Sequence, residues 1–156
     1  MITVEINESE TIEIESIVFD FNGTLAEDGL LNKEIKKRLE KLSEKVDIFI
    51  LTADTFGKVK EQVEDIPCKL EIISKEQQDL AKLNFVEELG LNYTATVGNG
   101  RNDVEMVKYS VLGIGVLQSE GIAVDLIKSA DIVCKSIEDV LDLFDKPLRL
   151  KATLRR

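Results

Sequence analysis

Apolar residues near the start of the chain follow two different patterns. They alternate with polar residues over 2–6 and 11–15, and the polar stretch 7–10 between them fits a turn, so we predict a β-hairpin. Residues 17–19 then form a continuous apolar run, which suits a parallel strand that is buried on both faces. We therefore expect an N-terminal hairpin followed by a central strand that ends at Asp20.

Apolar residues recur at helical spacing in three later segments. The first begins after Asn32, the second stops before Pro67, and the third opens at Ser136. Their apolar faces consist of Ile35, Leu39, Leu42 and Val46, of Phe56, Val59, Val63 and Ile66, and of Ile137, Val140, Leu141 and Phe144. A fourth helix is predicted to close at Gly90. Capping boxes are predicted at two helix starts, Ser74 with Gln77 and Ser136 with Asp139.

Short apolar runs separate these helices and predict five more strands, at 48–51, 70–73, 94–97, 111–116 and 131–134. The alternation of strands and helices predicts an α/β fold, a Rossmann-like doubly wound parallel sheet with helices on both faces. The 156 residues suit a single domain. We divide that domain into a hairpin (1–15), an α/β core (16–145) and a C-terminal tail (146–156).

The composition is that of a globular protein with an acidic surface. Apolar residues make up 44% of the chain and charged residues 32%, and the formal net charge is −10. Nucleic acids and anionic membranes require a basic surface, so we expect neither as a partner. The sequence has no bilayer-length apolar run and no secretory signal, so we expect a cytoplasmic protein whose Cys68 and Cys134 are reduced thiols.

Histidine is absent from the sequence, which narrows the possible chemistry. Ser-His-Asp and Cys-His catalytic sites, and zinc sites with histidine ligands, are excluded. Any catalysis must use carboxylates, lysine, hydroxyl and amide groups, and a hard metal ion. Clusters of such groups follow three predicted strands, at 20–24, 52–54 and 98–103. Because ligands bind beyond the carboxyl ends of the strands in doubly wound sheets, we predict that these clusters form one site.

The clusters resemble the motifs of the haloacid-dehalogenase-like hydrolase superfamily. Asp20-Phe21-Asn22-Gly23-Thr24 resembles its first motif, Asp-x-Asp-Gly-Thr, and Thr52 at a strand end resembles the second. Lys82 near a helix start resembles the third motif, and Gly98-Asn99-Gly100-Arg101-Asn102-Asp103 resembles the fourth, Gly-Asp-Gly-x-Asn-Asp. The resemblance spans roughly residues 16–135, and the chain looks most like soluble proteins similar to the phosphorylation domain of P-type ATPases.

This resemblance implies a role for each matching residue. Asp20 would attack phosphorus and form an acyl phosphate. The phosphoryl group would be held by Thr52, Lys82 and the backbone around Phe21, Gly23 and Ala53. A second lysine, Lys75, remains an alternative to Lys82.

The resemblance also implies a Mg²⁺ cofactor, bound by oxygen ligands. Asp20, the main-chain carbonyl of Asn22, Asn99 and Asp103 would bind it, and Asn102 would orient Asp103 by a hydrogen bond.

Two residues depart from the motifs. Asn22 stands where the superfamily usually has an Asp that acts as general acid and base, and Asn99 stands in place of the first acidic residue of the fourth motif. General acid–base catalysis contributes about 10²–10⁴-fold, and an amide cannot supply it. We therefore expect Asn22 to slow turnover, above all the breakdown of the phosphoenzyme. A neutral Asn99 ligand predicts weaker Mg²⁺ binding.

The spacing of the motifs leaves no room for an inserted cap domain. A site without a cap would admit a macromolecular phosphorylated substrate, or would use a neighbouring subunit as a lid. The loop 27–29 after the first motif is placed to touch the substrate. Asp54 or Thr55 is expected to cap the following helix.

Three functions remain open from the sequence. The first is a Mg²⁺-dependent phosphatase with a phospho-Asp20 intermediate. The second is a regulatory protein that holds phosphate on Asp20 with little or no hydrolysis and binds a partner. The third is an interaction module that keeps the fold without the chemistry.

Overall fold

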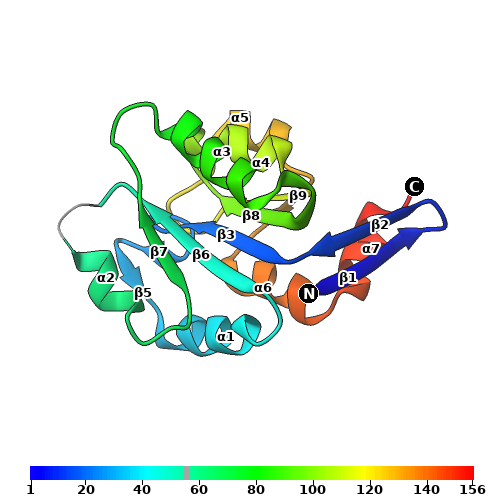
Figure 1. Cartoon of the computed structure of the whole chain (residues 1–156), viewed down its shortest axis with the longest axis horizontal. Helices are drawn as coiled ribbons and strands as arrows, with labels where there is room; N and C mark the ends of the chain where they lie inside the picture. Colours follow the sequence, from blue (N-terminus) through cyan, green and yellow to red (C-terminus); the bar gives the residue numbers. More distant parts are fainter. Residues whose placement is uncertain (55–56) are drawn as a thin grey trace.

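A computed structural model describes residues 1–54 and 57–156 (Figure 1). Its centre is a six-stranded sheet with the order β10-β9-β8-β3-β6-β7, in which every neighbouring pair is parallel. The six strands are β3 (Ser16–Asp20), β6 (Asp47–Thr52), β7 (Lys69–Ile72), β8 (Thr94–Gly98), β9 (Leu112–Val116) and β10 (Ile132–Cys134). The predicted Rossmann-like parallel sheet is confirmed.

Strand β3 lies at the middle of the sheet, and all five of its residues are buried. From β3 the chain adds β6 and β7 on one side, then returns to add β8, β9 and β10 on the other. The order of the strands therefore reverses between β3 and β8, where Phe19 pairs with Val97. In parallel α/β sheets, ligands bind at the carboxyl ends of the strands beside such a reversal.

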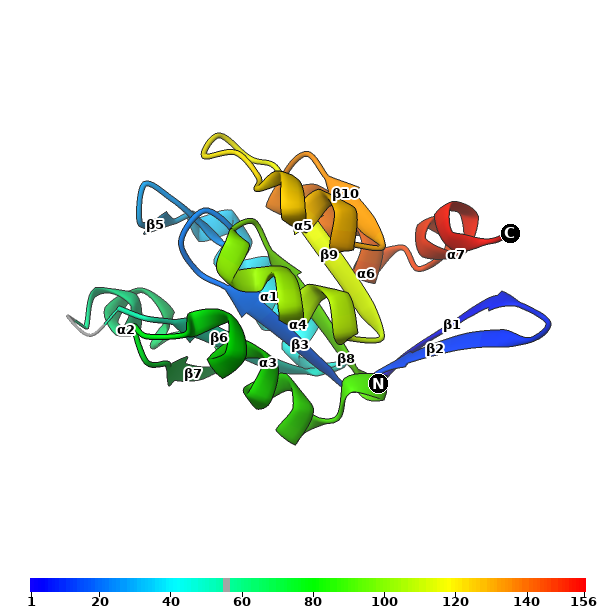
Figure 2. The same cartoon turned by 90° about the horizontal axis from the view of Figure 1, so that it is seen from above.

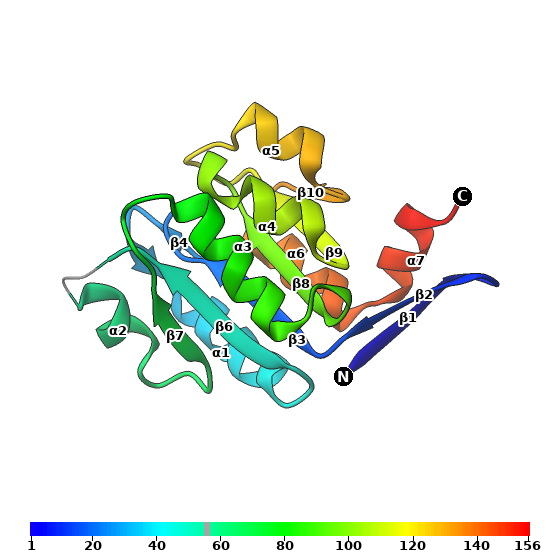
Figure 3. The same cartoon turned by 45° about the horizontal axis from the view of Figure 1, so that its top comes forward.

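Helices cover both faces of the sheet, as Figures 1 and 3 show. One face packs against α1 (Lys33–Ser43), α2 (Lys58–Val63) and α6 (Ile137–Asp145), which share a core with Ile17, Phe19, Ile48 and Ile50. The other face packs against α3 (Gln78–Leu89), α4 (Val104–Tyr109) and α5 (Val124–Ser129), with Val18, Phe49 and Leu51 between them. Alternate residues of β3 thus point into two separate cores, as expected for a strand buried on both faces.

The N-terminal hairpin β1 (Ile2–Asn7) and β2 (Glu10–Ile14) is antiparallel and projects from the core, as Figure 2 shows. Its inner face carries isoleucine and valine side chains, all of which are buried. The segment that follows α6, to which we assigned no element, forms helix α7 (Leu148–Leu154) and packs against β1. Leu150 of α7 is fully buried.

Several local predictions differ from the structure. Helix α3 begins at Gln78 and not at Ser74, because the Ser74 hydroxyl accepts the N–H of Glu76 in a local turn and Gln77 has a left-handed backbone (φ 50°). The capping box predicted there is therefore wrong, whereas Ser136 does cap α6 through the N–H of Asp139. Helices α4 and α5 were not predicted, because six residues contain too few turns to show a helical period. Thr55 and Phe56 lie outside the described residues.

The connections between the motifs are short in the described part of the chain. After β3 come the two-residue strands β4 (Ala26–Glu27) and β5 (Leu30–Leu31), and then α1. Within 1–54 and 57–156, no inserted domain interrupts the path from Asp20 to Lys82. Two short 3-10 turns, Leu91–Tyr93 and Arg101–Asp103, complete the fold. Among the described helices, none has both the length and the apolar character to cross a membrane.

Candidate active site

A cavity of about 620 Å³ lies at the carboxyl ends of the central strands. Asp20 enters it from the end of β3 and Thr52 from the end of β6, and Asn99 follows β8 directly. Helix α3 supplies Lys82, which also lines the cavity. The three clusters that the sequence predicted to meet are therefore brought together beside the strand reversal.

Lys82 lies at the centre of a buried group of charges. Its side chain is only 1% exposed, and its Nζ lies 2.7 Å from Asp20 Oδ1 and 2.5 Å from Asp103 Oδ1. The apolar neighbour Val86, one helical turn further along α3, is fully buried on the same side of the helix. Packing of this face of α3 against the sheet thus directs the lysine into the site. Lys75, the alternative, lines a different cavity.

Burial and charge shift the pKa values of this group. Burial, together with the negative charge of Asp103, raises the pKa of Asp20 to about 7, although Lys82 and Thr24 act in the opposite direction. Burial alone would lower the pKa of Lys82, but the charges of Asp20 and Asp103 outweigh it and the pKa lies above its ordinary value. Lys82 therefore stays protonated and is the strongest influence that favours the ionised form of Asp20.

Asp103 is held by the loop that follows β8. Its Oδ2 accepts the N–H groups of Asn99 at 3.0 Å and Gly100 at 2.9 Å, while Oδ1 accepts Lys82. A side chain at Gly98 would collide with this carboxylate, since a Cβ there would lie 2.5 Å from Asp103 Cγ. Both oxygens of Asp103 thus accept hydrogen bonds, and the fully buried side chain is not among the described residues that line the cavity.

Asn99 lies between two segments of the site. Its Nδ2 donates to the carbonyl of Gly121 at 3.2 Å, and its Oδ1 accepts the hydroxyl of Thr24 at 3.2 Å. A carboxylate at this position could not donate to the Gly121 carbonyl, so the amide suits the local hydrogen bonding. Gly23 has φ +77°, and a Cβ there would lie 2.4 Å from Asn99 Nδ2. Only glycine permits this approach.

Thr24 links Asp20 to Asn99. Its buried hydroxyl lies 3.2 Å from Asp20 Oδ2 and 3.2 Å from Asn99 Oδ1. We assigned Thr24 no catalytic role from the sequence. Its position at the end of the first motif, four residues after Asp20, is the sequence feature that could have indicated this contact. Two oxygens, Asp20 Oδ2 and Asn99 Oδ1, therefore lie close to the same hydroxyl group, and both residues line the cavity. Asn22 and Ala53 line the same cavity.

These oxygens are suited to a weakly held Mg²⁺ ion. Within residues 1–54 and 57–156, no group of three or more His, Cys, Asp or Glu side chains is arranged to hold a metal. The site offers the carboxylate of Asp20, the amide oxygen of Asn99 and main-chain carbonyls such as that of Asn22. All are hard oxygen donors, and Mg²⁺ is commonly bound by one or two carboxylates together with water and substrate phosphate. The donor set fits the ion, although it contains few charges.

Asn102 does not make the hydrogen bond that we expected. Its Nδ2 donates to Gln78 Oε1 at 2.8 Å, and it is Lys82 and the loop N–H groups that orient Asp103. Gln78, which the sequence did not single out, lines the cavity with Lys58 and Asp54. Thr52 Oγ1 accepts the N–H of Asp54 at 3.1 Å, so the hydroxyl oxygen of Thr52 is fixed in place.

Two comparisons by sequence concern proteins of Methanocaldococcus jannaschii. A soluble P-type ATPase-like phosphatase is 27% identical over 146 residues, which are 92% of this chain and 54% of that protein. The chain therefore spans about half the length of this relative. An uncharacterised protein is 43% identical over 82 residues, which are 50% of this chain and 88% of that protein. No protein-family model matches the chain.

Solved structures share the fold at low sequence identity. The cobalt-bound deoxy-D-mannose-octulosonate 8-phosphate phosphatase from Haemophilus influenzae aligns with a TM-score of 0.71 and 13% identity, over 91% of each chain. The 3-deoxy-D-manno-octulosonate 8-phosphate phosphatase from Moraxella catarrhalis, in complex with magnesium, phosphate and KDO, aligns with a TM-score of 0.65 and 18% identity, over 88% of this chain and 92% of that one. The arrangement of strands and helices is therefore that of these phosphatases.

Proposed function

The chain has the haloacid-dehalogenase-like fold, and from this premise we propose that it is a Mg²⁺-dependent phosphohydrolase that works through a phospho-Asp20 intermediate. One observation carries the proposal: buried Asp20 and Lys82 lie 2.7 Å apart in a cavity beside the strand reversal. A carboxylate that is directed into a polar cavity and paired with a buried ammonium suits nucleophilic attack on a phosphate ester. The likeness to a phosphatase over 92% of this chain supports the same reading.

In the first step, a carboxylate oxygen of Asp20 attacks phosphorus and the bond from phosphorus to the leaving oxygen breaks. The ammonium of Lys82, the hydroxyl of Thr52 and the backbone N–H groups of Phe21 and Ala53 would hold the phosphoryl oxygens. The N–H of Gly23, which we also expected to take part, instead donates to the Ala26 carbonyl at 2.8 Å. The leaving oxygen takes its proton from water, because the side-chain amide of Asn22 cannot act as a general acid. In the second step, water attacks phosphorus, the bond to Asp20 breaks, and inorganic phosphate leaves.

Asp20, Asn99 and the main-chain carbonyl of Asn22 would hold Mg²⁺ beside the phosphate. When bound, the ion would neutralise negative charge on the phosphoryl oxygens and so lower the barrier to attack. Asp103 serves Lys82 in this proposal, since its fully buried carboxylate accepts the lysine and two N–H groups of the loop. The cytoplasm is the proposed compartment, and the two free cysteines suit its reducing conditions.

A second candidate function is favoured by Asn22, which lines the cavity where the superfamily usually has an acid–base Asp. Without this carboxyl group, the activation of water for the second step is weak. The protein would then hold phosphate on Asp20 for a long time and act on a partner in that state.

The first test compares the protein with Asp20→Asn. We expect the protein to release phosphate from a generic aryl phosphate only when Mg²⁺ is present, and to bind beryllofluoride on Asp20. Asp20→Asn should reduce phosphate release to the background rate while circular dichroism shows an intact fold. Asp47→Asn, at the exposed opposite end of β6, is the matched control and should retain activity. Turnover that persists in Asp20→Asn would exclude the phospho-Asp20 route, and adduct formation with little release would favour the second function.

A further inference from the structure

A second cavity adjoins the one that contains Asp20. It measures about 550 Å³, and Gln78 and Asn102 line both cavities. A phosphate ester that is attacked by Asp20 has its phosphoryl group deep in the first cavity. The rest of the ester must extend outward, and the shared amide pair lies on one of the routes available to it.

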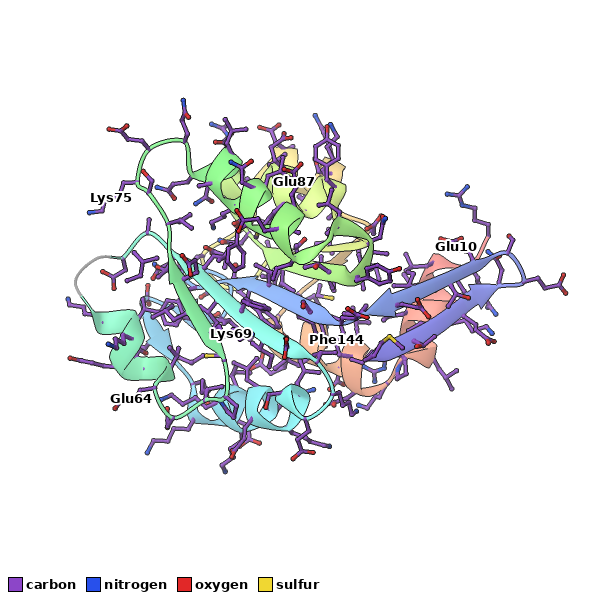
Figure 4. The ribbon with its side chains drawn as sticks, viewed as in Figure 1. Glu10, Glu64, Lys69, Lys75, Glu87 and Phe144 are labelled. Atoms are coloured by element: carbon purple, nitrogen blue, oxygen red, sulfur yellow. The ribbon has the colours of Figure 1, made fainter. Side chains whose placement is uncertain are left out.

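Hydrogen bonds fix this shared wall. Asn102 Nδ2 donates to Gln78 Oε1 at 2.8 Å, and Gln78 Nε2 donates to the main-chain carbonyl of Lys75 at 3.2 Å. The segment before α3 is thereby tied to the loop that follows β8. Lys75 is carried by the first segment and Arg101 by the second, and both line the second cavity. In Figure 4 the Lys75 side chain extends outward from the connection between β7 and α3.

The second cavity is basic in a protein whose net charge is −10. Among the described residues that line this cavity, Lys75 and Arg101 are basic and one residue, Asp79, is acidic. The side chain of Arg101 is 85% exposed, and its Nε lies 3.5 Å from Asp125, which is also exposed. Such an exposed pair contributes little energy, so its guanidinium can change partners readily. Arginine binds carboxylate and phosphate through two parallel hydrogen bonds.

We propose that this second cavity, with Arg101 and Lys75, binds an anionic group on the leaving-group side of the substrate. The substrate class is then a phosphate monoester that carries a further carboxylate or phosphate, in preference to esters of neutral alcohols. Gln78 is a positioning residue that holds the two basic segments together. This inference rests on the proposed phosphatase function and adds the chemical class of its substrate.

The test uses matched pairs of esters. 3-Phosphoglycerate is compared with glycerol 3-phosphate, and glucose 1,6-bisphosphate with glucose 6-phosphate, by kcat/KM for phosphate release. In at least one pair, we expect the member with the additional anionic group to have a kcat/KM about tenfold or more higher than its partner, as charge-assisted hydrogen bonds allow. The pair that shows the preference tells whether a carboxylate or a phosphate is bound.

Variants then locate the preference in the molecule. Arg101→Gln and Lys75→Gln should each reduce the ratio of kcat/KM for the ester with the additional anionic group to kcat/KM for its partner without it. The reduction should be larger for Arg101→Gln. Arg155→Gln removes one exposed positive charge far along the chain and should leave the ratio unchanged. A ratio near one in the unmodified protein, or an equal loss in all three variants, would overturn the proposal.

Failure of the proposed function is distinguishable from failure of this inference. If aryl phosphate is released in an Asp20-dependent way but the ester pairs are not distinguished, the phosphatase stands and the subsite is rejected. If no ester is turned over, calorimetric binding of the same pairs to the full chain decides. Tighter binding of the esters with the additional anionic group, if it is lost in Arg101→Gln, supports the subsite. Equal binding of the two members of each pair rejects it.

Discussion

At the scale of single residues, the site is organised by Lys82. A buried ammonium is costly unless it is paired, and here two carboxylates pair with it at 2.7 and 2.5 Å. Asp20 is one of these carboxylates, and Asp103 is the other, fixed by two backbone N–H groups. Asn22 and Asn99, which line the cavity together with Asp20, carry no charge.

The neutral Asn22 gives a prediction about the second chemical step. Asn22→Asp should speed the release of phosphate by about 10²-fold, because a carboxyl group can accept a proton from the attacking water. Steady-state release from an aryl phosphate and the lifetime of the phosphoenzyme would both be measured. Asn84→Asp adds the same charge at an exposed position of α3 and should change neither. An unchanged lifetime in Asn22→Asp would show that a missing acid–base group does not limit turnover.

At the scale of elements, charged side chains join three helices. Arg38 of α1 donates to Asp142 at 2.8 Å and to Asp145 at 3.0 Å, both on α6. Lys146 and Arg149, at the start of the segment that forms α7, also donate to Asp142. Hydrogen bonds from Lys146 and then from Arg38 lower the pKa of Asp142 to about 2, although its limited burial acts in the opposite direction.

This cluster predicts how stability depends on pH. Because the pKa of Asp142 is below its ordinary value of 3.8, its contribution is fully present above about pH 4 and is lost as the pH falls toward 2. Asp142→Asn should lower the free energy of unfolding by about 1 kcal/mol at pH 7, since water partly screens these pairs. Urea unfolding between pH 7 and pH 3 would show the difference from the unmodified protein becoming smaller.

Asp65 is the matched control for Asp142. It pairs with Lys36 at 3.0 Å on the surface of the same side of the protein, but is largely exposed. Asp65→Asn should therefore have a smaller effect at neutral pH. An equal change in the free energy of unfolding in both variants would indicate that stability responds to net charge in general and not to the cluster around Arg38.

At the scale of the whole molecule, a hairpin and a helix extend the fold beyond the six-stranded sheet. Figures 2 and 4 show β1 and β2 projecting from the core, with Glu10 near the tip and Phe144 near the base. A two-stranded hairpin alone is marginally stable in water, so its buried face needs a covering element. Helix α7 supplies that cover, and Leu150 is fully buried in the resulting core.

Leu150 therefore gives a prediction about this extension. Leu150→Ala should lower the free energy of unfolding by about 2–5 kcal/mol, because it removes buried apolar groups and leaves a cavity. Urea or thermal unfolding would measure the change. Leu148→Ala on the same helix removes a side chain that is 79% exposed and should change stability by less than about 0.5 kcal/mol. Similar losses in the two variants would mean that α7 does not cover the hairpin as described.

The sequence by itself determined the class of fold and the position of the site along the chain. Continuous apolar runs identify β3 and β6 because a strand buried on both faces has no polar positions to alternate. Asp20 and Thr52 then follow as strand ends, and a doubly wound order brings strand ends together. These inferences need only local periodicity and the general geometry of parallel sheets.

Tertiary structure alone decided which side chains meet. Lys82 and Lys75 are both lysines close to the start of α3, and only packing of the helix against the sheet places Lys82 within 2.7 Å of Asp20. In the same way, Asn102 contacts Gln78, which lies 24 positions earlier in the chain. Helix α7 packs on β1 through long-range contacts, which the sequence of the helix by itself does not reveal. Such pairings depend on distances between elements, and these are fixed by the packing of the whole core and by no local pattern.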